Sequence, residues 1–132
     1  MTNSVASFSP HNHASGQTPT FQDETAIRQL FENLVSSWNK GDGEAYANQF
    51  TENSDYIAFD GTHFKGRRAN AENHQRLFDT FLKGSTLEGQ RVTDLRFLTP
   101  DVALLHMVGT VKLKWQKRVA PERFSIQTLV AI

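Results

Sequence analysis

The stretch "DYIAFDGTHFKGRRANAENHQ", residues 55–75, decides the fold because it joins a strand, a turn and a helix in one short segment. Its apolar start predicts a strand over 55–59, "DGTHFKG" predicts a turn, and a helix is expected from about residue 66 to 82. Arg67 and Arg68 then fall at the helix N-terminus, where free N–H groups already carry about half a positive charge. Each arginine therefore needs an anionic partner, a bound anion or water.

The apolar stripe of this helix separates the two arginines. Arg67 and His74 lie on the stripe, and Arg68 lies on the opposite, polar face. A guanidinium directed inward must find a carboxylate or carbonyl oxygens, so we expect a structural salt bridge from Arg67 to Asp55 or Asp60. A ligand-binding role for Arg67 stays open as the alternative.

Two further helices are expected before this stretch. Apolar residues recur at helical spacing from Ile27 to Trp38, which predicts an amphipathic helix of about five turns with Thr20 as its N-cap. "NKGD" ends this helix, and Gly41 is expected to take the left-handed conformation that closes helices. Asp42 then starts a short second helix over "GEAYANQF".

A long β region follows the third helix. Its strands are expected at roughly 87–98, 102–116 and 123–132, separated by "TPD" and "VAPE". The order helix, helix, strand, helix and then several antiparallel strands predicts an α+β fold in which helices pack against a curved sheet.

The middle strand of this region is apolar on both faces over its first half. Its odd-numbered residues are apolar throughout, and Val102, Leu104 and Val108 add apolar side chains on the even side. We therefore expect a homodimer in which a second subunit covers the outer face of the sheet. His106 belongs to the even side unless a bulge at Gly109 shifts the parity.

Length and composition describe one neutral domain. The chain has 132 residues, 38% of them hydrophobic, with 14 basic and 14 acidic side chains, so we expect a single domain over 21–132. Neither nucleic acid nor a membrane is expected as a partner, despite the basic "KLKWQKR" at 112–118. No cysteine is present, which excludes disulfides and thiolate chemistry. Without an apolar span or a signal peptide, a cytoplasmic protein is expected.

Residues 1–20 contain no charged side chain. Such a segment buries too little apolar surface to offset the entropy lost on ordering, so a flexible polar tail is expected. His11 and His13 lie within it, and we do not expect them to bind metal because a metal site needs three or four ligands on a fixed frame.

Four short motifs follow one another at compatible spacing. They are W-x-x-G-D at Trp38 to Asp42, G-x-x-x-x-G-R at Gly61 to Arg67, H-x-x-L-F at His74 to Phe78, and P-D-V-A-L-L-H at Pro100 to His106. Through them, about residues 22–132 resemble the SnoaL-like, ketosteroid-isomerase-like branch of the nuclear transport factor 2-like superfamily, and within it the SgcJ/EcaC-type group.

The resemblance implies a cone-shaped roll. In such proteins a strongly curved antiparallel sheet wraps one long and two shorter helices, opens at one end to a pocket, and generally dimerises through its outer face. Similar proteins continue through a turn into one more strand after the one that ends at Ile132. Either that strand is missing or the chain continues, and a missing strand would leave an apolar edge for something else to cover.

The resemblance also implies a kind of chemistry. Enzymes with this cone move a proton with a carboxylate or histidine in a dry pocket, helped by a tyrosine or second acid that holds the developing oxyanion. The candidate catalytic residues are His74, Asp55 and His106. The candidate ligand-binding residues are Trp38, Tyr46, Phe50, Tyr56, Phe59, Arg67, Phe78 and Phe97. The structural alternatives stay open: a hydrogen-bonded core histidine, packing tyrosines, and an aspartate that serves Arg67.

Two functions are compatible with these residues. The first is an isomerase, cyclase or dehydratase that acts on a small apolar or aromatic ligand without a metal or cofactor. The second is a non-catalytic association or ligand-binding module. A deep cavity in which an ionisable side chain meets a second polar group would favour the enzyme, whereas a cavity plugged by Phe and Trp would favour the module.

Overall fold

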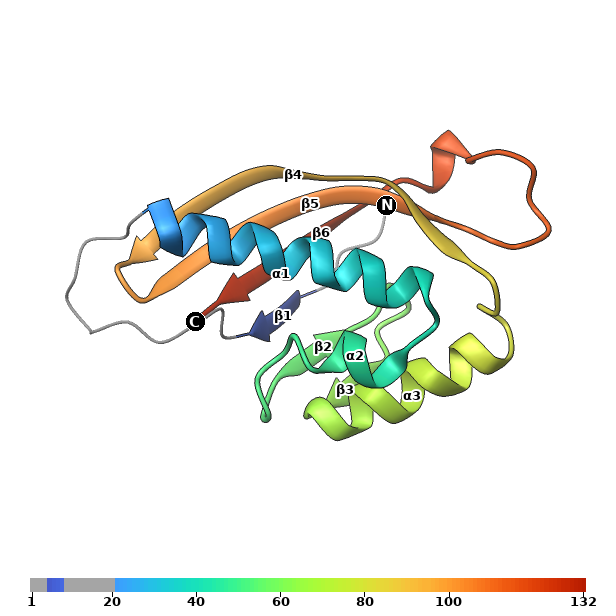
Figure 1. Cartoon of the computed structure of the whole chain (residues 1–132), viewed down its shortest axis with the longest axis horizontal. Coiled ribbons are helices and arrows are strands. Elements are labelled where there is room, and N and C mark those ends of the chain that lie inside the picture. Colours follow the sequence, from blue (N-terminus) through green and yellow to red (C-terminus); the bar gives the residue numbers. More distant parts are fainter. Residues whose placement is uncertain (1–4, 9–20) are drawn as a thin grey trace.

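The computed structural model describes residues 5–8 and 21–132 of the chain. Three helices lie on one side of a four-stranded sheet with the order β1, β6, β5, β4, and a separate β2–β3 hairpin lies beside them (Figure 1). In chain order the elements are β1 (Val5–Phe8), α1 (Phe21–Asn39), α2 (Gly43–Ala47), β2 (Asp55–Ile57), β3 (His63–Lys65), α3 (Arg67–Asp79), β4 (Thr86–Thr99), β5 (Val102–Lys112), the 3-10 helix η1 (Pro121–Arg123) and β6 (Ser125–Ala131). This arrangement confirms the predicted α+β fold, and the sheet is not closed.

The first helix begins and ends much as the sequence predicts, whereas the second begins as predicted but ends at Ala47, before the end of the predicted "GEAYANQF". The apolar stripe of α1 is buried at Ile27, Leu30, Leu34 and Trp38, and Gly41 ends this segment with a φ of 68°. Asp42 caps α2, because its carboxylate accepts a hydrogen bond of 3.0 Å from the backbone N–H three residues on. The predicted cap Thr20 lies outside the described residues. None of the described helices is long and apolar enough to cross a bilayer.

A glycine lets α2 lie directly on α3. A Cβ atom on Gly43 would be 2.7 Å from a backbone carbonyl oxygen of α3, so a larger residue would force the two helices apart. The Gln75 side chain joins the helices by accepting from Gly43 N–H at 2.8 Å and donating to the Gly41 carbonyl at 3.2 Å. This contact places Tyr46 of α2 against His74 of α3.

The two faces of β5 differ in exposure. The inner residues Ala103, Leu105 and Met107 are buried, and the outer residues Leu104, His106 and Val108 are partly exposed. Pairing of β5 with β6 continues in register through Gly109, so the parity does not shift there and His106 lies on the outer face. The irregularities fall between β4 and β5 instead, one of them between Glu88 and Arg91.

The segment Val5–Phe8 forms strand β1. It pairs in parallel with β6, with Val5 opposite Thr128 and Phe8 opposite Ala131, so the expected flexible tail is wrong for these four residues. Here β1 covers the edge of β6 and lies between β6 and β2 (Figure 1). The rest of the expected tail, with His11 and His13, lies outside the described residues.

Part of the predicted turn after β2 is a strand. His63–Lys65 form β3 and pair antiparallel with β2, so the turn is confined to 58–62, where the Asp60 carboxylate accepts from Thr62 N–H at 3.0 Å. A strand of three residues is too short to show a periodicity.

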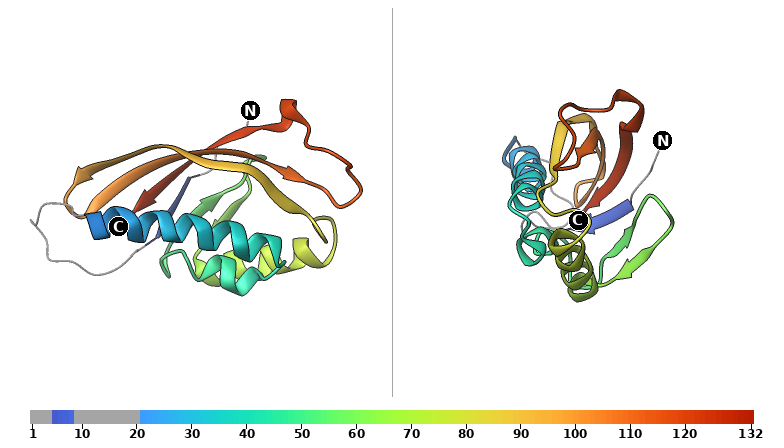
Figure 2. Two further views of the ribbon diagram at one scale, coloured as in Figure 1. Left: turned by 45° about the horizontal axis from the view of Figure 1, so that its top comes forward. Right: turned by 90° about the vertical axis from the view of Figure 1, so that its right-hand side faces the viewer.

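The long strands β4 and β5 arch over α1 (Figure 2). Strand β5 ends at Lys112, short of the predicted end at 116, and Trp115 is exposed.

Candidate functional site

Five aromatic side chains surround His74 in the core. The ring centroid of His74 lies 4.7 Å from that of Tyr46, 4.8 Å from that of Tyr56 and 5.4 Å from that of Phe64. Trp38 and Phe78 contact it at 5.9 Å each. The five rings come from α1, α2, β2, β3 and α3, so packing of all five elements forms this His74 ring cluster.

Hydrogen bonds and burial determine the chemical form of His74. Its Nδ1 lies 3.0 Å from the Asn70 backbone oxygen and 2.6 Å from Asn70 Oδ1. Because a backbone carbonyl only accepts, Nδ1 carries the proton and the neutral ring keeps a lone pair on Nε2. Burial lowers the pKa of His74 to about 4, although the hydrogen bond to Asn70 opposes this shift. His74 is therefore uncharged at neutral pH.

Two phenols meet beside this histidine. The hydroxyl oxygens of Tyr46 and Tyr56 are 3.1 Å apart, and both side chains are buried. Burial raises the pKa of both phenols above the ordinary value of 10.0, so both are protonated at neutral pH. The pair holds two hydroxyl protons and uses one between its own oxygens. The other remains available to donate to a further oxygen.

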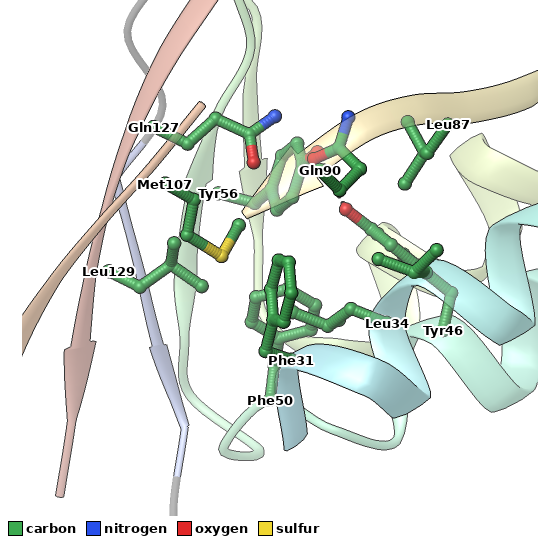
Figure 3. A pocket seen from close by; sticks show the side chains of 11 residues that line it. Phe31, Leu34, Tyr46, Phe50, Tyr56, Leu87, Gln90, Met107, Gln127 and Leu129 are labelled. Carbon is green, nitrogen blue, oxygen red and sulfur yellow. Dashed lines mark hydrogen bonds between the residues drawn. The ribbon is translucent and has the colours of Figure 1, made fainter. Parts of the chain in front are cut away.

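The two tyrosines line a small cavity of about 20 Å³. Figure 3 shows its lining: Phe31, Leu34, Val35, Tyr46, Phe50, Tyr56, Leu87, Gln90, Met107, Gln127 and Leu129. None of these side chains is charged. The polar groups are the two phenols and the carboxamides of Gln90 and Gln127, which lie above Phe31 and Phe50 in this view. The volume suits about one water molecule, whereas ligand sites usually need about 300 Å³ or more.

The predicted ligand-binding residues separate into groups. Those that line the cavity are Tyr46, Phe50 and Tyr56. Those that instead pack on His74 are Trp38 and Phe78. Phe97 is partly buried and packs against the core, whereas Phe59 is 73% exposed and forms no wall. Their roles in binding stay predictions, but the geometry brings the first group together.

Only one of the predicted catalytic residues lies near the phenols, and that residue is His74. The Asp55 carboxylate is exposed and pairs with the exposed His63 Nε2 at 2.7 Å. His106 lies on the outer face of the sheet, with its Nδ1 3.7 Å from the Asp94 carboxylate. Neither Asp55 nor His106 lines the cavity.

Arg67 binds a backbone carbonyl, and the predicted salt bridge is wrong. Its Nε and Nη2 donate to the Phe50 carbonyl oxygen at 2.9 and 2.7 Å. The reason is local: carbonyls just after a short helix lack helical partners, while Asp55 already pairs with a histidine and Asp60 holds its own turn. Arg68 lies in solvent as predicted, paired with a glutamate one turn later at 2.9 Å.

Sequence reasoning missed the two cavity carboxamides. Gln127 shares its parity with the buried Leu129 and Ala131 of β6, and a polar residue at an inward position was a signal that could have identified it. Gln90 gives no such signal, because it lies where the register of β4 shifts.

In the part of the chain that the structure describes, no three His, Cys, Asp or Glu side chains come together as a metal site.

The sequence and structure of the chain were compared with those of known proteins. No family model matches the sequence, and no curated protein matches it. A domain of unknown function with a cystatin-like fold from Nostoc punctiforme PCC 73102 is 35% identical with a TM-score of 0.74, over 85% of this chain and 78% of that one.

Two more distant structures share the fold. A protein proposed to be a scytalone dehydratase from Novosphingobium aromaticivorans DSM 12444 is 12% identical with a TM-score of 0.59, over 83% of each chain. An NTF-2 like protein of unknown function from Shewanella oneidensis MR-1 is 18% identical with a TM-score of 0.52, over 80% of this chain and 96% of that one. On the identity and coverage of the Nostoc match, the chain belongs to the family of that domain of cystatin-like fold.

Proposed function

We propose that this protein is a SnoaL-like enzyme that binds a small neutral, largely apolar molecule and carries out acid/base chemistry of the isomerase, cyclase or dehydratase type. One observation carries the proposal. The hydrogen-bonded phenols of Tyr46 and Tyr56 lie at an uncharged cavity and against the neutral ring of His74. A core that served packing alone would have no need of two phenol hydroxyls and an imidazole in one place.

The phenol pair supplies the electrophilic part of this chemistry. Its free O–H donates to a carbonyl or hydroxyl oxygen of the ligand, and in apolar surroundings such a hydrogen bond stabilises the negative charge that develops on that oxygen. Because burial raises the pKa of both phenols, the protons stay on the tyrosines at neutral pH. A charged ligand fits poorly, since no lining side chain offers an opposite charge.

His74 acts on the ligand through the phenols, because it contacts both tyrosine rings and does not line the cavity. Its neutral form leaves the phenol protons in place, whereas an imidazolium in the same position would lower the pKa of both tyrosines. The lone pair on Nε2 makes the ring a weak base that holds a proton only transiently. The proposed reaction class rests on these groups and not on the distant dehydratase-like structure.

A thermal-shift and binding series with aromatic polyketides, steroids and small carboxylic acids tests the proposal. We expect neutral ketones and phenols to raise Tm and carboxylic acids to have no effect. Tyr56→Phe keeps the ring and removes one hydroxyl, so affinity for a neutral ketone should fall about fivefold or more. Leu87→Ala is the matched control, because it alters the same cavity without removing a donor. Absence of any shift would refute the ligand-binding proposal.

A non-catalytic association module is the second candidate, and the size of the cavity favours it. At about 20 Å³, with Phe31 and Phe50 in its lining, the cavity holds no substrate unless it opens. If none of the compounds binds, association through the surface becomes the better account of this chain.

We also propose that a second copy of the chain covers the outer face of the sheet. Leu104 is paired with Val130 and Val108 with Ile126, which gives a partly exposed apolar surface across β5 and β6. Leu104→Glu would bury a charge at the centre of such an interface and should convert a dimer to a monomer in light scattering. Phe81→Glu, on an exposed residue after α3, is the control. A wild-type monomer at high concentration would exclude this dimer.

A further inference from the structure

The cavity beside the two phenols has a neighbour on the surface. An open groove of about 500 Å³ runs between α1 and β4, and we call it the outer groove. Its lining residues are Phe31, Glu32, Val35, Ser36, Asn39, Lys40 and Gln90. Phe31, Val35 and Gln90 also line the cavity, so these three side chains alone belong to both spaces and form the wall between them.

A bulge in β4 positions Gln90 in this wall. Glu88 is paired with Thr110 and Arg91 with Val108, so two residues of β4 face the single residue Gly109. The first of these two is a glycine with a φ of 64°, a conformation that favours glycine. The extra residue directs the Gln90 side chain inward, toward α1.

Gly109 provides the space that Gln90 occupies. A Cβ atom on Gly109 would lie 2.0 Å from Gln90 Nε2 and 2.2 Å from Gln90 Cδ. The carboxamide therefore rests directly on the backbone of β5. Any other residue at position 109 would place its Cβ atom in the space that the carboxamide fills. Gln90 is held there because its neighbour has no side chain.

The hydrogen bonds that hold Gln90 are long. Nε2 donates to the Thr110 carbonyl oxygen at 3.3 Å and to the Glu88 carbonyl oxygen at 3.4 Å, beyond the roughly 2.7–3.2 Å of a well-formed N–H···O bond. All three wall residues are partly exposed, but Phe31 and Val35 lie in the middle of a helix, which limits their side-chain rotamers, whereas Gln90 lies on a strand and its carboxamide is held only by these two long hydrogen bonds. Of the three wall residues, Gln90 moves at the lowest cost.

We propose that Gln90 is the gate of the ligand cavity: rotation of its side chain off Gly109 joins the cavity to the outer groove and admits a small neutral apolar molecule between α1 and β4. This inference rests on the proposed ligand-binding function. The joined space, at about 500 Å³ or more, falls within the range of small-molecule sites. The ligand's oxygen reaches the Tyr46–Tyr56 pair at the inner end, and its apolar body lies along Phe31 and Val35.

The chain contains a matched control for this gate. Gln127 is a second carboxamide that lines the cavity, but it lies on β6 and does not line the outer groove. Truncation of either glutamine enlarges the cavity by the same atoms, and only truncation of Gln90 opens the wall. The comparison between Gln90→Ala and Gln127→Ala therefore separates an effect on the rate at which the ligand enters from an effect of the larger cavity volume.

Uptake of N-phenyl-1-naphthylamine, a neutral aromatic amine with environment-sensitive fluorescence, measures entry. The sequence has two methionines, and Met107 lines the cavity. Methionine methyl ¹³C labelling therefore shows whether the probe occupies the cavity or binds elsewhere. We expect Gln90→Ala to raise the association rate about tenfold or more over wild type, and Gln127→Ala to leave it within about twofold.

A second variant should open the wall between the cavity and the outer groove without changing Gln90. Gly109→Ala places a methyl group where the carboxamide rests, so it should also speed uptake. Thermal melts establish that each variant is folded. If the probe shifts the Met107 signal in wild type but neither variant speeds its entry, the gate is refuted and the cavity remains a ligand site. If the Met107 signal shifts in no protein, both the gate and the proposed function fail.

Discussion

His74 and His106 have the same side chain in opposite surroundings. His74 is 2% exposed, packed against five aromatic rings and bonded to Asn70 through Nδ1, and burial lowers its pKa to about 4. The His106 side chain is 34% exposed on the outer face of the sheet, 3.7 Å from the Asp94 carboxylate. The difference shows that the surroundings of a histidine, and not its presence in a motif, decide whether it packs among aromatic rings in the core or lies partly in solvent.

The packing around His74 gives the largest expected effect. Phe78→Ala should reduce the free energy of unfolding by about 3–5 kcal/mol, because it leaves a cavity against His74 and Trp38. The control Phe81→Ala removes the same atoms from a side chain that is 72% exposed and should cost less than about 0.5 kcal/mol. Urea denaturation measures both, and equal costs would contradict a tightly packed ring cluster.

The pH dependence of stability sharpens the comparison between the two histidines. The pKa of His74 is about 4 in the folded protein against an ordinary value of 6.5, so between these values the unfolded chain binds more protons than the folded one. Stability therefore falls as pH drops from 6.5 to 4, with a His74 contribution of about 3 kcal/mol. Above pH 6.5 this contribution no longer changes.

Denaturation at several pH values checks this contribution against matched variants. His74→Gln should remove it, and His106→Gln should retain it, because that variant leaves His74 and its surroundings unchanged. Identical pH profiles for wild type and His74→Gln would mean that His74 can be protonated without loss of stability. The contrast drawn between the surroundings of His74 and His106 would then be wrong.

The neighbouring Arg67 and Arg68 also differ in their surroundings, and the stability lost on replacing each should differ with them. Arg67→Met keeps most of the side-chain shape but removes both hydrogen bonds to the Phe50 carbonyl, so a loss of about 1.5–3 kcal/mol is expected. Arg68→Met removes one exposed pair with Glu72, and because solvent screens such a pair the variant should melt close to wild type. Thermal melts measure both variants, and a loss for Arg68→Met as large as that for Arg67→Met would show that the hydrogen bonds from Arg67 to the Phe50 carbonyl add nothing special to stability.

The smallest effect is expected at the surface of the β2–β3 hairpin. Asp55→Asn weakens a pair with His63 in which both side chains are exposed, so stability should change by no more than about 0.5 kcal/mol. Binding of a neutral ketone should also be unchanged, because Asp55 does not line the cavity. Loss of binding in Asp55→Asn would restore the catalytic role predicted from the sequence and weaken the role given to His74.

Local periodicity explains which elements the sequence predicted well. The stripe of α1, the end of that helix at Gly41 and the cap at Asp42 depend only on residues within a few positions of one another. The alternation along β5 set His106 on the face opposite Leu105 for the same reason, but only the structure showed that the face of Leu105 is the buried one. These features survive in the tertiary structure because burial of the apolar faces acts in the same direction as local preference.

Contacts between distant parts of the chain explain the failures. The strand β1 pairs with residues at the far end of the sequence, and nothing in its own composition indicates that partner. The partner of Arg67 is a main-chain oxygen of residue 50, which side-chain identity cannot reveal. Gln90 reaches the wall of the cavity through a register shift between two strands, which is a property of the pair and of neither strand alone.

The sequence by itself determined the α+β order of elements, the inward face of α1 and the neutral balance of charge, because each depends on residue type and short-range spacing. Only the tertiary structure decided that Tyr46, Tyr56 and His74 meet, and that Gln90 rests on Gly109 beside them. The reason is geometric: these groups come from separate elements, and their distances are set by the packing of helices on a bulged sheet.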